Sequence, residues 1–301
     1  MASEVTIHPT AVVEPGAKFA PGVSIGPYAI IGGAVSLGEG TVVMSHASVI
    51  GNTTIGKNCK IFQSSVIGGV PQDLKYRGED TRVEIGDNNY IREYVTVNKG
   101  TAGGGGVTRI GNRNLIMAYV HIAHDCIIGD ECILANVTTL AGHIVIEDKA
   151  RISGLAALHH FVSVGTLSFI GGCSKINQDV PPYCLVDGNP SRVRGLNIEG
   201  LKRANIDRRT INGLKEAFRM LYRSDMNRSQ AVDELKGSPL FEAFPEVRHL
   251  VQFVEKEVSG WRGRGLEAMR TDRPAGFTSE QSAEDEDEDE QEQAQQKGNT
   301  G

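Results

Sequence analysis

The chain places a large apolar residue at every sixth position over more than half of its length. Before a first interruption these residues are Ile7, Val13, Phe19, Ile25, Ile31, Leu37, Val43, Val49, Ile55, Ile61 and Ile67. The series resumes at Ile85, Ile91 and Val97, and again at Ile110, Ile116, Ile122, Ile128, Leu134, Leu140, Ile146, Ile152, Leu158, Val164, Ile170 and Ile176. An amphipathic helix would space apolar residues three and four apart, and a half-buried strand would alternate them. A period of six therefore predicts neither.

Small residues accompany this period. Glycine often follows the apolar residue directly, as at Gly26, Gly32, Gly38, Gly56, Gly68, Gly86, Gly111, Gly129, Gly165 and Gly171. The fourth position after it is usually small, as at Ala11, Ala17, Ala29, Ala47, Cys59, Cys126, Cys132 and Ala156. This is the hexapeptide signature of a parallel β-helix, an all-β solenoid. Three hexapeptides form one triangular coil, and coils stack about 4.8 Å apart. We therefore interpret Cys59, Cys126 and Cys132 as small core residues rather than reactive thiols.

Two segments interrupt the period, and both are predicted to be loops. The first lies near 68–84 and preserves the phase, because Ile67 and Ile85 are three periods apart. The second, near 99–109, reads "KGTAGGGGVTR" and shifts the phase by one position. Loops on a rigid scaffold are frequent carriers of function. Both segments are therefore candidates for contributing to a site.

A helical pattern replaces the period after the prolines of "DVPPYCLVDGNPSRVRG", which cannot continue strand pairing. The segment "RRTINGLKEAFRMLYRS" predicts an amphipathic helix whose apolar face contains Ile211, Leu214, Phe218, Leu221 and Tyr222. Two further helices are predicted at "RSQAVDELK" and "FPEVRHLVQFVEKEV". We predict a β-helix over 1–190, a small α-helical C-terminal domain over 191–270 that caps the solenoid, and a disordered acidic tail over 271–301.

The net charge of the chain is negative because of its acidic tail, and the rest of the chain is slightly basic. Residues 271–301 contain ten acidic and two basic residues, whereas the rest contains 29 basic and 27 acidic ones. A net charge of about +2 suits an anionic substrate or an acidic partner, but it is far from that of a nucleic-acid-binding protein. Five cysteines without a Cys-x-x-Cys spacing indicate reduced thiols. With no apparent signal peptide and no apolar stretch long enough to span a bilayer, we expect a cytoplasmic protein without stable membrane insertion.

Histidines gather on one predicted edge of the solenoid. Because Ile122 belongs to the core, His121 and His124 on either side of it point outward. One coil adds three hexapeptides, so Gly142 is expected directly above His124. The same edge is predicted to carry His143 and His160, and His159 adjoins them in the neighbouring phase of the repeat.

This arrangement allows two kinds of chemistry. Histidine exchanges a proton near neutral pH, Asp125 could hold its tautomer, and the Gly142 N–H could stabilise an oxyanion. No serine or cysteine is paired with a histidine, so we expect direct transfer to a hydroxyl or amine acceptor. A zinc site of the trimeric hexapeptide carbonic anhydrase type is the alternative. A purely structural solenoid is disfavoured by the clustered histidines.

Several ordered motifs resemble the bacterial UDP-N-acetylglucosamine O-acyltransferase family. They are "HIAHDC", "LAGHIVI", "IGGCSKINQDVPPY" and "GLNIEGLKR", together with the loop segments "QDLKYRGEDTRVEIGDNNYIRE" and "GTAGGGGVTRIG". The resemblance implies a left-handed parallel β-helix and a homotrimer with sites between subunits. It also implies transfer of a 3-hydroxyacyl chain from acyl carrier protein to the 3-hydroxyl of UDP-N-acetylglucosamine, the first step of lipid A biosynthesis. Neither a cofactor nor a metal is implied.

The resemblance assigns roles to individual residues. It implies that His124 is the general base, that Asp125 orients it and that the Gly142 N–H serves the oxyanion. The residues implied to contact substrate are Gln72, Asp73, Lys75, His121, His143, His159, His160, Gly172, Asn197, Glu199 and Arg203. Among these, the last three would hold the nucleotide. The acidic carrier protein is expected to dock near Arg192, Arg194, Lys202 and Arg203.

The sequence departs from the family pattern at three positions. His160 stands where the family often has Gln, Asn98 replaces a His, and Ala204 replaces an Arg in some members. These changes put peripheral ligand contacts in doubt. Gly172 occupies a position that varies with acyl length, and its lack of a side chain leaves room for about 14 carbons. Acylation of a 3-amino sugar stays open, since one base could serve either nucleophile.

Overall fold

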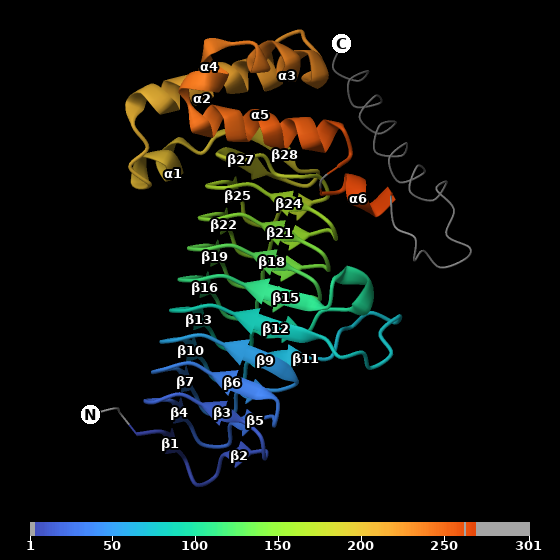
Figure 1. Ribbon diagram of the computed structural model, residues 1–301. Coiled ribbons are helices and arrows are strands. Elements are labelled where there is room, and N and C mark those ends of the chain that lie inside the picture. The colour runs from blue at the N-terminus through green and yellow to red at the C-terminus, as the bar shows by residue number, and fades with distance from the viewer. Residues whose placement is uncertain (1–3, 262, 269–301) are drawn as a thin grey trace. The chain divides into compact units, whose positions relative to one another are not determined.

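The structure is a computed structural model that describes residues 4–261 and 263–268. The predicted acidic tail over 271–301 lies outside the described residues. The N-terminal part is a three-sided prism whose walls are parallel sheets, here called sheets A, B and C (Figure 1). Successive strands enter sheets A, B and C in turn, so that each coil adds one strand to every wall.

The strands are short and regularly spaced in all three sheets. Sheet A contains β1 (Thr6–Ile7), β4 (Ser24–Ile25), β7 (Val42–Val43), β10 (Lys60–Ile61), β13 (Tyr90–Ile91), β16 (Leu115–Ile116), β19 (Ile133–Leu134), β22 (Arg151–Ile152), β25 (Phe169–Ile170), β27 (Cys184–Asp187) and β28 (Arg192–Leu196). Sheet B contains β2 (Val12–Val13), β5 (Ile30–Ile31), β8 (Ser48–Val49), β11 (Val66–Gly69), β14 (Thr96–Asn98), β17 (His121–Ile122), β20 (Thr139–Leu140), β23 (Ala157–Leu158) and β26 (Lys175–Ile176). Sheet C contains β3 (Lys18–Phe19), β6 (Val35–Leu37), β9 (Asn52–Ile55), β12 (Arg82–Ile85), β15 (Val107–Ile110), β18 (Ile127–Ile128), β21 (Val145–Ile146) and β24 (Ser163–Val164).

The predicted six-residue period is the core of this prism. Its members from Ile25 onward are buried, and those of successive coils pair in register, as Ile128 does with Ile146. Cys59, Cys126 and Cys132 are also fully buried, as predicted. Burying an isoleucine or leucine side chain contributes roughly 1.5–3 kcal/mol, so the stacked apolar columns are the main stabilising feature of the scaffold.

Both loops leave the prism at the edge where sheet B passes to sheet C, which we call the B–C edge. The first runs over 70–81 between β11 and β12, and the second runs over 99–106 between β14 and β15 and contains the short 3-10 helix η1 (Ala102–Gly104). They are shorter than predicted because β12 and β15 extend toward the loops and pair over four residues. The coils that carry the loops are longer than three hexapeptides, since Ile55 pairs with Ile85 and Ile85 with Ile110.

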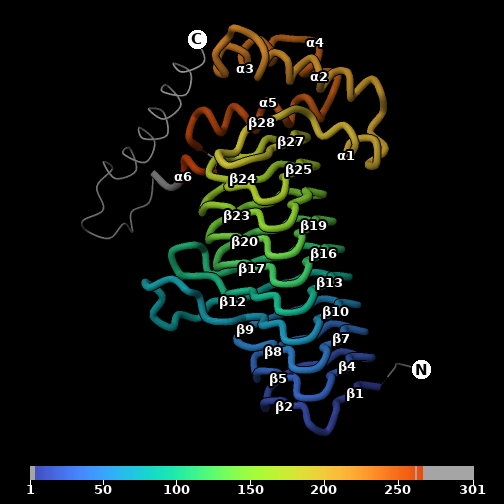
Figure 2. Tube along the Cα trace, turned by 180° about the vertical axis from the view of Figure 1, so that it is seen from behind, coloured from blue at the N-terminus to red at the C-terminus, as the bar shows by residue number. Residues whose placement is uncertain are grey.

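The C-terminal part closes one end of the prism. Strands β27 and β28 form an antiparallel hairpin on sheet A, and helices follow, as Figure 2 shows from behind. The helices are α1 (Ile198–Arg203), α2 (Arg208–Arg223), α3 (Arg228–Lys236), α4 (Pro239–Ala243), α5 (Pro245–Val258) and α6 (Gly265–Ala268). The predicted apolar face of α2 is largely buried and packs with α3 and α5 in a second core. The domain boundary at residue 190 stays a prediction.

Within the described residues, no helix has the length and apolar character needed to cross a membrane.

Candidate active site

The B–C edge brings the predicted chemistry together. In the coils above the two loops the chain leaves sheet B at a buried residue such as Ile122, turns through four residues and enters sheet C. The third residue after the buried one has a left-handed backbone, with φ of 60° at Asp125, 63° at His143 and 65° at Phe161. Asp and Asn tolerate this conformation better than most residues. Equivalent positions of successive turns, here Asp125, His143 and Phe161, therefore follow one another along the edge.

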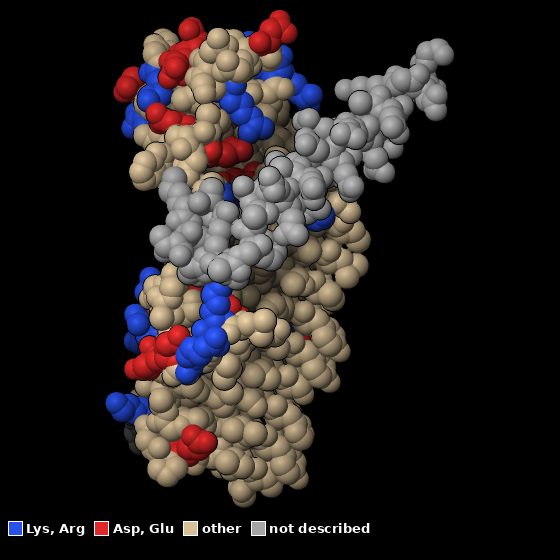
Figure 3. All heavy atoms as spheres, turned by 90° about the vertical axis from the view of Figure 1, so that its right-hand side faces the viewer, with Lys and Arg blue, Asp and Glu red and all other residues tan. Residues whose placement is uncertain are grey.

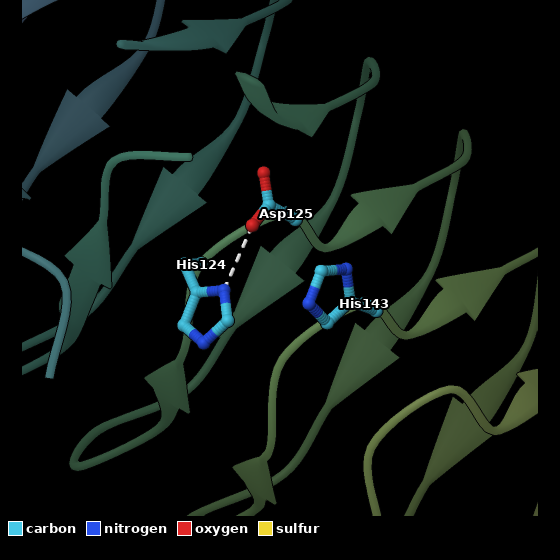
Figure 4. Close-up of side chains that lie close together, drawn as sticks. All are labelled: His124, Asp125 and His143. Atoms are coloured by element: carbon cyan, nitrogen blue, oxygen red, sulfur yellow. Dashed lines mark hydrogen bonds and ion pairs between the residues drawn. The ribbon is translucent and has the colours of Figure 1, made fainter. Parts of the chain in front are cut away.

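His124 and Asp125 form a hydrogen-bonded pair at this edge. The distance from His124 Nδ1 to Asp125 Oδ2 is 2.8 Å (Figure 4). The Asp125 side chain is fully buried, whereas 14% of the His124 side chain is exposed. An ionised carboxylate can only accept, so Nδ1 carries the proton and donates it. The other ring nitrogen, Nε2, is consequently left with a lone pair, which is the state that a general base requires.

The second loop holds Asp125 in place. The Thr101 N–H donates to Asp125 Oδ1 over 2.9 Å, and the Thr101 hydroxyl donates to Oδ2 over 2.6 Å. The Asp125 N–H in turn donates to the Thr108 hydroxyl over 2.8 Å. Burial acts to raise the pKa of the Asp125 carboxyl, but the hydrogen bonds from His124 and Thr101 outweigh burial and lower it. Asp125 is therefore a fixed anion beside His124.

Glycines allow the second loop to approach Asp125 this closely. A Cβ at Gly104 would overlap the Asp125 carboxyl group. A Cβ at Gly100 would lie 2.8 Å from Asp125 Oδ1 and overlap the backbone of the loop itself. Two glycines of the motif, Gly100 and Gly104, are thus explained by the packing of backbone against a carboxylate.

Gly142 lies against the imidazole of His124, as the length of one coil predicted. A Cβ at Gly142 would stand 2.7 Å from His124 Nε2. In the part of the chain that the structure describes, the Gly142 N–H has no hydrogen-bond partner. The His143 ring meets His124 edge-on at 5.0 Å between centroids, and Phe161 stacks on His143 at 4.4 Å. Figure 4 shows His124 and His143 flanking the space in front of Asp125.

The remaining histidines surround this pair. The distance from His121 Nδ1 to the Thr96 hydroxyl is 2.7 Å. Burial and, to a lesser extent, the nearby His124 charge lower the pKa of His121. His159 and His160 lie two coils above, with ring centroids 3.9 Å apart. The predicted edge is therefore present, with His124 and His143 in direct contact and His160 further along it.

The same residues also have the geometry of a possible metal-ligand set. His124, Asp125 and His143 each offer a ligand atom, and these atoms lie within 4.8 Å of one another. However, both Asp125 oxygens already accept hydrogen bonds from Thr101, and His124 Nδ1 is directed at Asp125. A metal ion would have to displace these bonds. The donor set therefore fits an acid–base pair better than a zinc centre.

Comparison with known proteins gives one family. A family model described as UDP-N-acetylglucosamine O-acyltransferase, domain 2, matches residues 179–266, and a bacterial transferase hexapeptide model matches residues 108–142. LpxA from Acinetobacter baumannii is 44% identical, with 83% of this chain and 96% of that chain covered and a TM-score of 0.81. UDP-N-acetylglucosamine O-acyltransferase from Moraxella catarrhalis is 43% identical, with coverages of 85% and 98% and a TM-score of 0.82. This chain belongs to the UDP-N-acetylglucosamine O-acyltransferase family.

A further member, from Bacteroides fragilis, is 40% identical over 86% of this chain and 99% of its own, with a TM-score of 0.81. The resemblance inferred from the sequence motifs is thereby confirmed. The left-handed parallel β-helix and the acyltransferase class that the resemblance implied are confirmed with it.

The other residues to which the family resemblance assigns substrate contacts lie in three different parts of the chain. Gln72, Asp73 and Lys75 lie in the first loop, which leaves the same B–C edge. Gly172 lies between β25 and β26, at the edge joining sheets A and B. The third group consists of Glu199 and Arg203 in α1 and Asn197 at its N-cap, and α1 is on the opposite side of the molecule from the loops (Figures 1 and 2).

Asn197 and Glu199 make contacts with residues near them in the structure. Asn197 caps α1, accepting from the Gly200 N–H and donating to the Leu167 carbonyl, so it has a structural task of its own. Glu199 pairs with Lys202 at 2.8 Å on an exposed surface.

The three departures from the family pattern lie outside the His124–Asp125 pair. The amide of Asn98 is buried and donates to the Val70 carbonyl, which ties β14 to the first loop. His160 contacts His159 and Phe161, and Ala204 ends α1.

The sequence reasoning did not identify Thr101, Thr108 or Arg264 as site residues. The glycine-rich motif contained Thr101, but only the folded loop shows that its hydroxyl reaches Asp125. Arg264 contacts His159 from 105 positions away in the sequence, and no local pattern predicts such a contact.

Proposed function

We propose that this protein transfers a 3-hydroxyacyl chain from acyl carrier protein to the 3-hydroxyl of UDP-N-acetylglucosamine, the first step of lipid A biosynthesis. The observation that carries the proposal is the His124–Asp125 pair, which leaves Nε2 unprotonated beside Gly142. Membership of the acyltransferase family supports the class of both substrates.

The geometry supports direct transfer in two steps. His124 Nε2 accepts the proton of the sugar hydroxyl as its oxygen attacks the thioester carbonyl of the acyl carrier. The tetrahedral intermediate then collapses, the carbon–sulfur bond breaks, and the carrier thiol leaves with the proton from His124. Asp125 stays ionised and stabilises the transient imidazolium, as a triad carboxylate does.

The oxyanion of the intermediate needs a donor close to His124. The Gly142 N–H suits this role, because Gly142 lies at that ring and its N–H has no hydrogen-bond partner among residues 4–261 and 263–268. A preorganised donor of this kind typically contributes about 10²–10³ in rate. His121 and His143 flank the pair and are proposed to line the sugar, with Gln72, Asp73 and Lys75 contributed by the first loop.

A homotrimer is proposed because the residues to which the family resemblance assigns substrate contacts do not all lie around one site within a single chain. The outward residues of sheet B are uncharged from β2 to β23, namely Val12, Ile30, Ser48, Val66, Thr96, His121, Thr139 and Ala157. Figure 3 shows a broad uncharged surface over the lower coils. Beside sheet B, Tyr94 and Tyr119 stack at 4.8 Å while staying about half exposed. An uncharged face of this size suits contact with another copy.

A cleft between copies would place Gly172 of one chain near His124 of the next. We propose that the absent side chain at Gly172 lets the site accept a long acyl chain of about 14 carbons. Assays with carriers of graded acyl length test this directly, and a tenfold preference for short chains would oppose it.

The C-terminal part is proposed to bind the acidic carrier and the nucleotide. Arg192, Arg194 and Arg203 are exposed there, and arginine forks suit diphosphate and carboxylate groups. We propose that the nucleotide contacts Asn197, Glu199 and Arg203, that His159 and His160 line the ligand above His124, and that the enzyme acts in the cytoplasm.

The test is to identify the product. The full chain is incubated with UDP-N-acetylglucosamine and a 3-hydroxyacyl carrier protein, and the sugar nucleotide is analysed by mass spectrometry. We expect one added acyl group that mild base removes, as an ester on oxygen requires. Turnover of only the 3-amino analogue, giving a base-stable amide, would contradict O-acylation. Loss of activity on chelation, restored by zinc, would favour the metal alternative.

A further inference from the structure

The stretch from Lys99 to Thr101 lies between the first loop and Asp125. Thr101 donates to both carboxylate oxygens of Asp125. The Lys99 N–H donates to the carbonyl oxygen of Gly69, the last residue of β11, over 2.9 Å. The Lys99 side chain reaches further, to the middle of the first loop, where Nζ lies 2.9 Å from the Tyr76 hydroxyl oxygen. Both loops leave the prism on the same side (Figure 1), and this stretch connects them.

The contact between Lys99 and Tyr76 has a definite direction. An ammonium group can only donate, so the Tyr76 oxygen accepts from Lys99 Nζ. The hydroxyl proton of Tyr76 is then directed at the Glu79 carbonyl oxygen, 2.9 Å away. The ammonium also lies over the Tyr76 ring, 5.4 Å from its centroid. Two hydrogen bonds in series thus run from a charged donor into the first loop, and a charged donor makes the stronger kind of bond.

Hydrogen bonds within the first loop shape its central turn. Asp73 accepts twice, from the Lys75 N–H to its carboxylate over 2.9 Å and from the Tyr76 N–H to its carbonyl oxygen over 3.0 Å. These bonds join residues of the loop to one another, so they fix its conformation but not its place on the prism. Because Tyr76 belongs to this turn, Lys99 acts on the position of the whole turn through one side chain.

Lys99 itself is held by the packing of its neighbours. Its side chain is half-buried, and the two residues that follow it, Gly100 and Thr101, are buried. A Cβ at Gly100 would lie 2.8 Å from Asp125 Oδ1, so the backbone here is pressed against the carboxylate. The stem of Lys99 passes close to Gly51, where an added Cβ would stand 3.1 Å from Lys99 Cδ. The ammonium therefore extends from a fixed base.

We propose that Lys99 is a positioning residue that fixes the first loop relative to the His124–Asp125 pair. The loop residues proposed to contact substrate, Gln72, Asp73 and Lys75, are thereby held at a set distance from the proposed base. The inference rests on the proposed function for the identity of the ligand and of the base, whereas the attachment of the loop does not depend on it. Since the Lys99 side chain contacts the loop, its loss should weaken substrate binding rather than the chemical step.

The first test follows the loop itself and needs no substrate. Hydrogen exchange of the full chain is measured by mass spectrometry on peptides that cover 70–81 and, as an internal reference, 245–258. In Lys99→Met, which keeps an unbranched apolar stem without the charge, the loop amides should exchange about tenfold faster, the effect of one hydrogen bond to a charged group, with the reference unchanged. Unchanged exchange in the loop would overturn the proposal. Tyr76→Phe, which keeps the ring but removes the acceptor, is the second variant and should give at least the same increase.

The second test is kinetic. We expect Lys99→Met to raise KM for UDP-N-acetylglucosamine about tenfold, with kcat within about twofold. Lys99→Arg keeps a charged donor and should stay close to wild type. Lys60→Met is the matched control, because Lys60 also lies over a tyrosine ring, that of Tyr90, but on sheet A. A fall in kcat at constant KM would overturn the proposal, because the effect would then lie on the reacting groups rather than on the loop.

A double variant tests whether Lys99 acts through Tyr76. In a Tyr76→Phe background, Lys99→Met should add little to KM, because the acceptor is already absent. An equal increase in that background would contradict action through the Tyr76 hydroxyl. A wild type that does not acylate the nucleotide sugar would refute the proposed function, while the exchange result on the loop would stand.

Discussion

The hydroxyl of Thr101 donates to the same Asp125 oxygen that accepts the hydrogen bond from His124. The two distances are 2.6 Å and 2.8 Å, and the oxygen is shielded from solvent. Thr101 therefore acts on His124 through Asp125, although it does not touch the imidazole. The second loop, which interrupts the repeat in the sequence, in this way holds the pair that we propose to be catalytic.

Replacing Thr101 tests this link. Thr101→Val keeps the shape and the backbone N–H but removes the hydroxyl, so the carboxylate loses one donor and its orientation. We expect kcat/KM to fall by about tenfold or more, the effect of one hydrogen bond to a charged group. Thr101→Ser retains the hydroxyl and should stay near wild type; an equal loss in both variants would contradict the link.

The lowered pKa of Asp125 predicts how the stability of the folded state depends on pH. Its carboxyl ordinarily titrates near 3.8, and a lowered pKa in the folded state means that its stabilising effect is fully present above that value. That effect is lost only as pH falls through the lowered pKa. Between pH 8 and 5 the difference in stability between wild type and Asp125→Asn should therefore be constant, as measured by denaturant unfolding. A stability difference that falls between pH 8 and 5 would argue instead that Asp125 titrates in that range.

A methyl group at residue 142 should block the site. The Cβ of Gly142→Ala would stand 2.6–2.7 Å from the His124 ring, so the imidazole must move away from Asp125 or from the substrate. We expect activity to fall by about 10²-fold, since misplacement of a catalytic group by roughly 1 Å has that effect. Gly195→Ala is the control, because nothing lies within 4 Å of the added atom there. Comparable kinetics for the two variants would mean that His124 does not need its present position.

The cysteines provide a test of the scaffold. Burial raises the pKa of the Cys126 and Cys132 thiols to about 12, and Cys59 and Cys184 are also buried. Cys173 is exposed. A thiol reagent should therefore modify one cysteine quickly in the native protein, and Cys173→Ser should abolish that reaction. Rapid modification of Cys126, next to the Asp125 anion, would show that the core at this edge is open.

The repeat made the prism predictable because its core positions obey a local rule. Each six-residue step moves one wall further around, so the burial of Ile122 and the outward direction of His124 follow from counting. The same count placed Gly142 beside His124. The coils that contain the two loops are longer than 18 residues, because Ile55 pairs with Ile85 and Ile85 with Ile110, so counting could not predict which residues pair there.

The six-residue period could not predict contacts between segments that lie far apart in the sequence. Thr101 reaches Asp125 only because two glycines admit the backbone, and Arg264 reaches His159 only because the helical part turns back to the prism. The roles of Asn197, Glu199 and Arg203 came from the family resemblance, and they stay predictions. Within one chain these residues lie away from His124.

The most direct test of the account is the turnover of His124→Ala with UDP-N-acetylglucosamine and 3-hydroxyacyl carrier protein. Removing a general base typically costs about 10²–10⁴ in rate, so kcat should fall by that factor while the melting temperature stays close to wild type. His8→Ala, an exposed histidine of the first coil, is the matched control and should be fully active. Near-normal turnover in His124→Ala would contradict the central claim that His124 is the catalytic base.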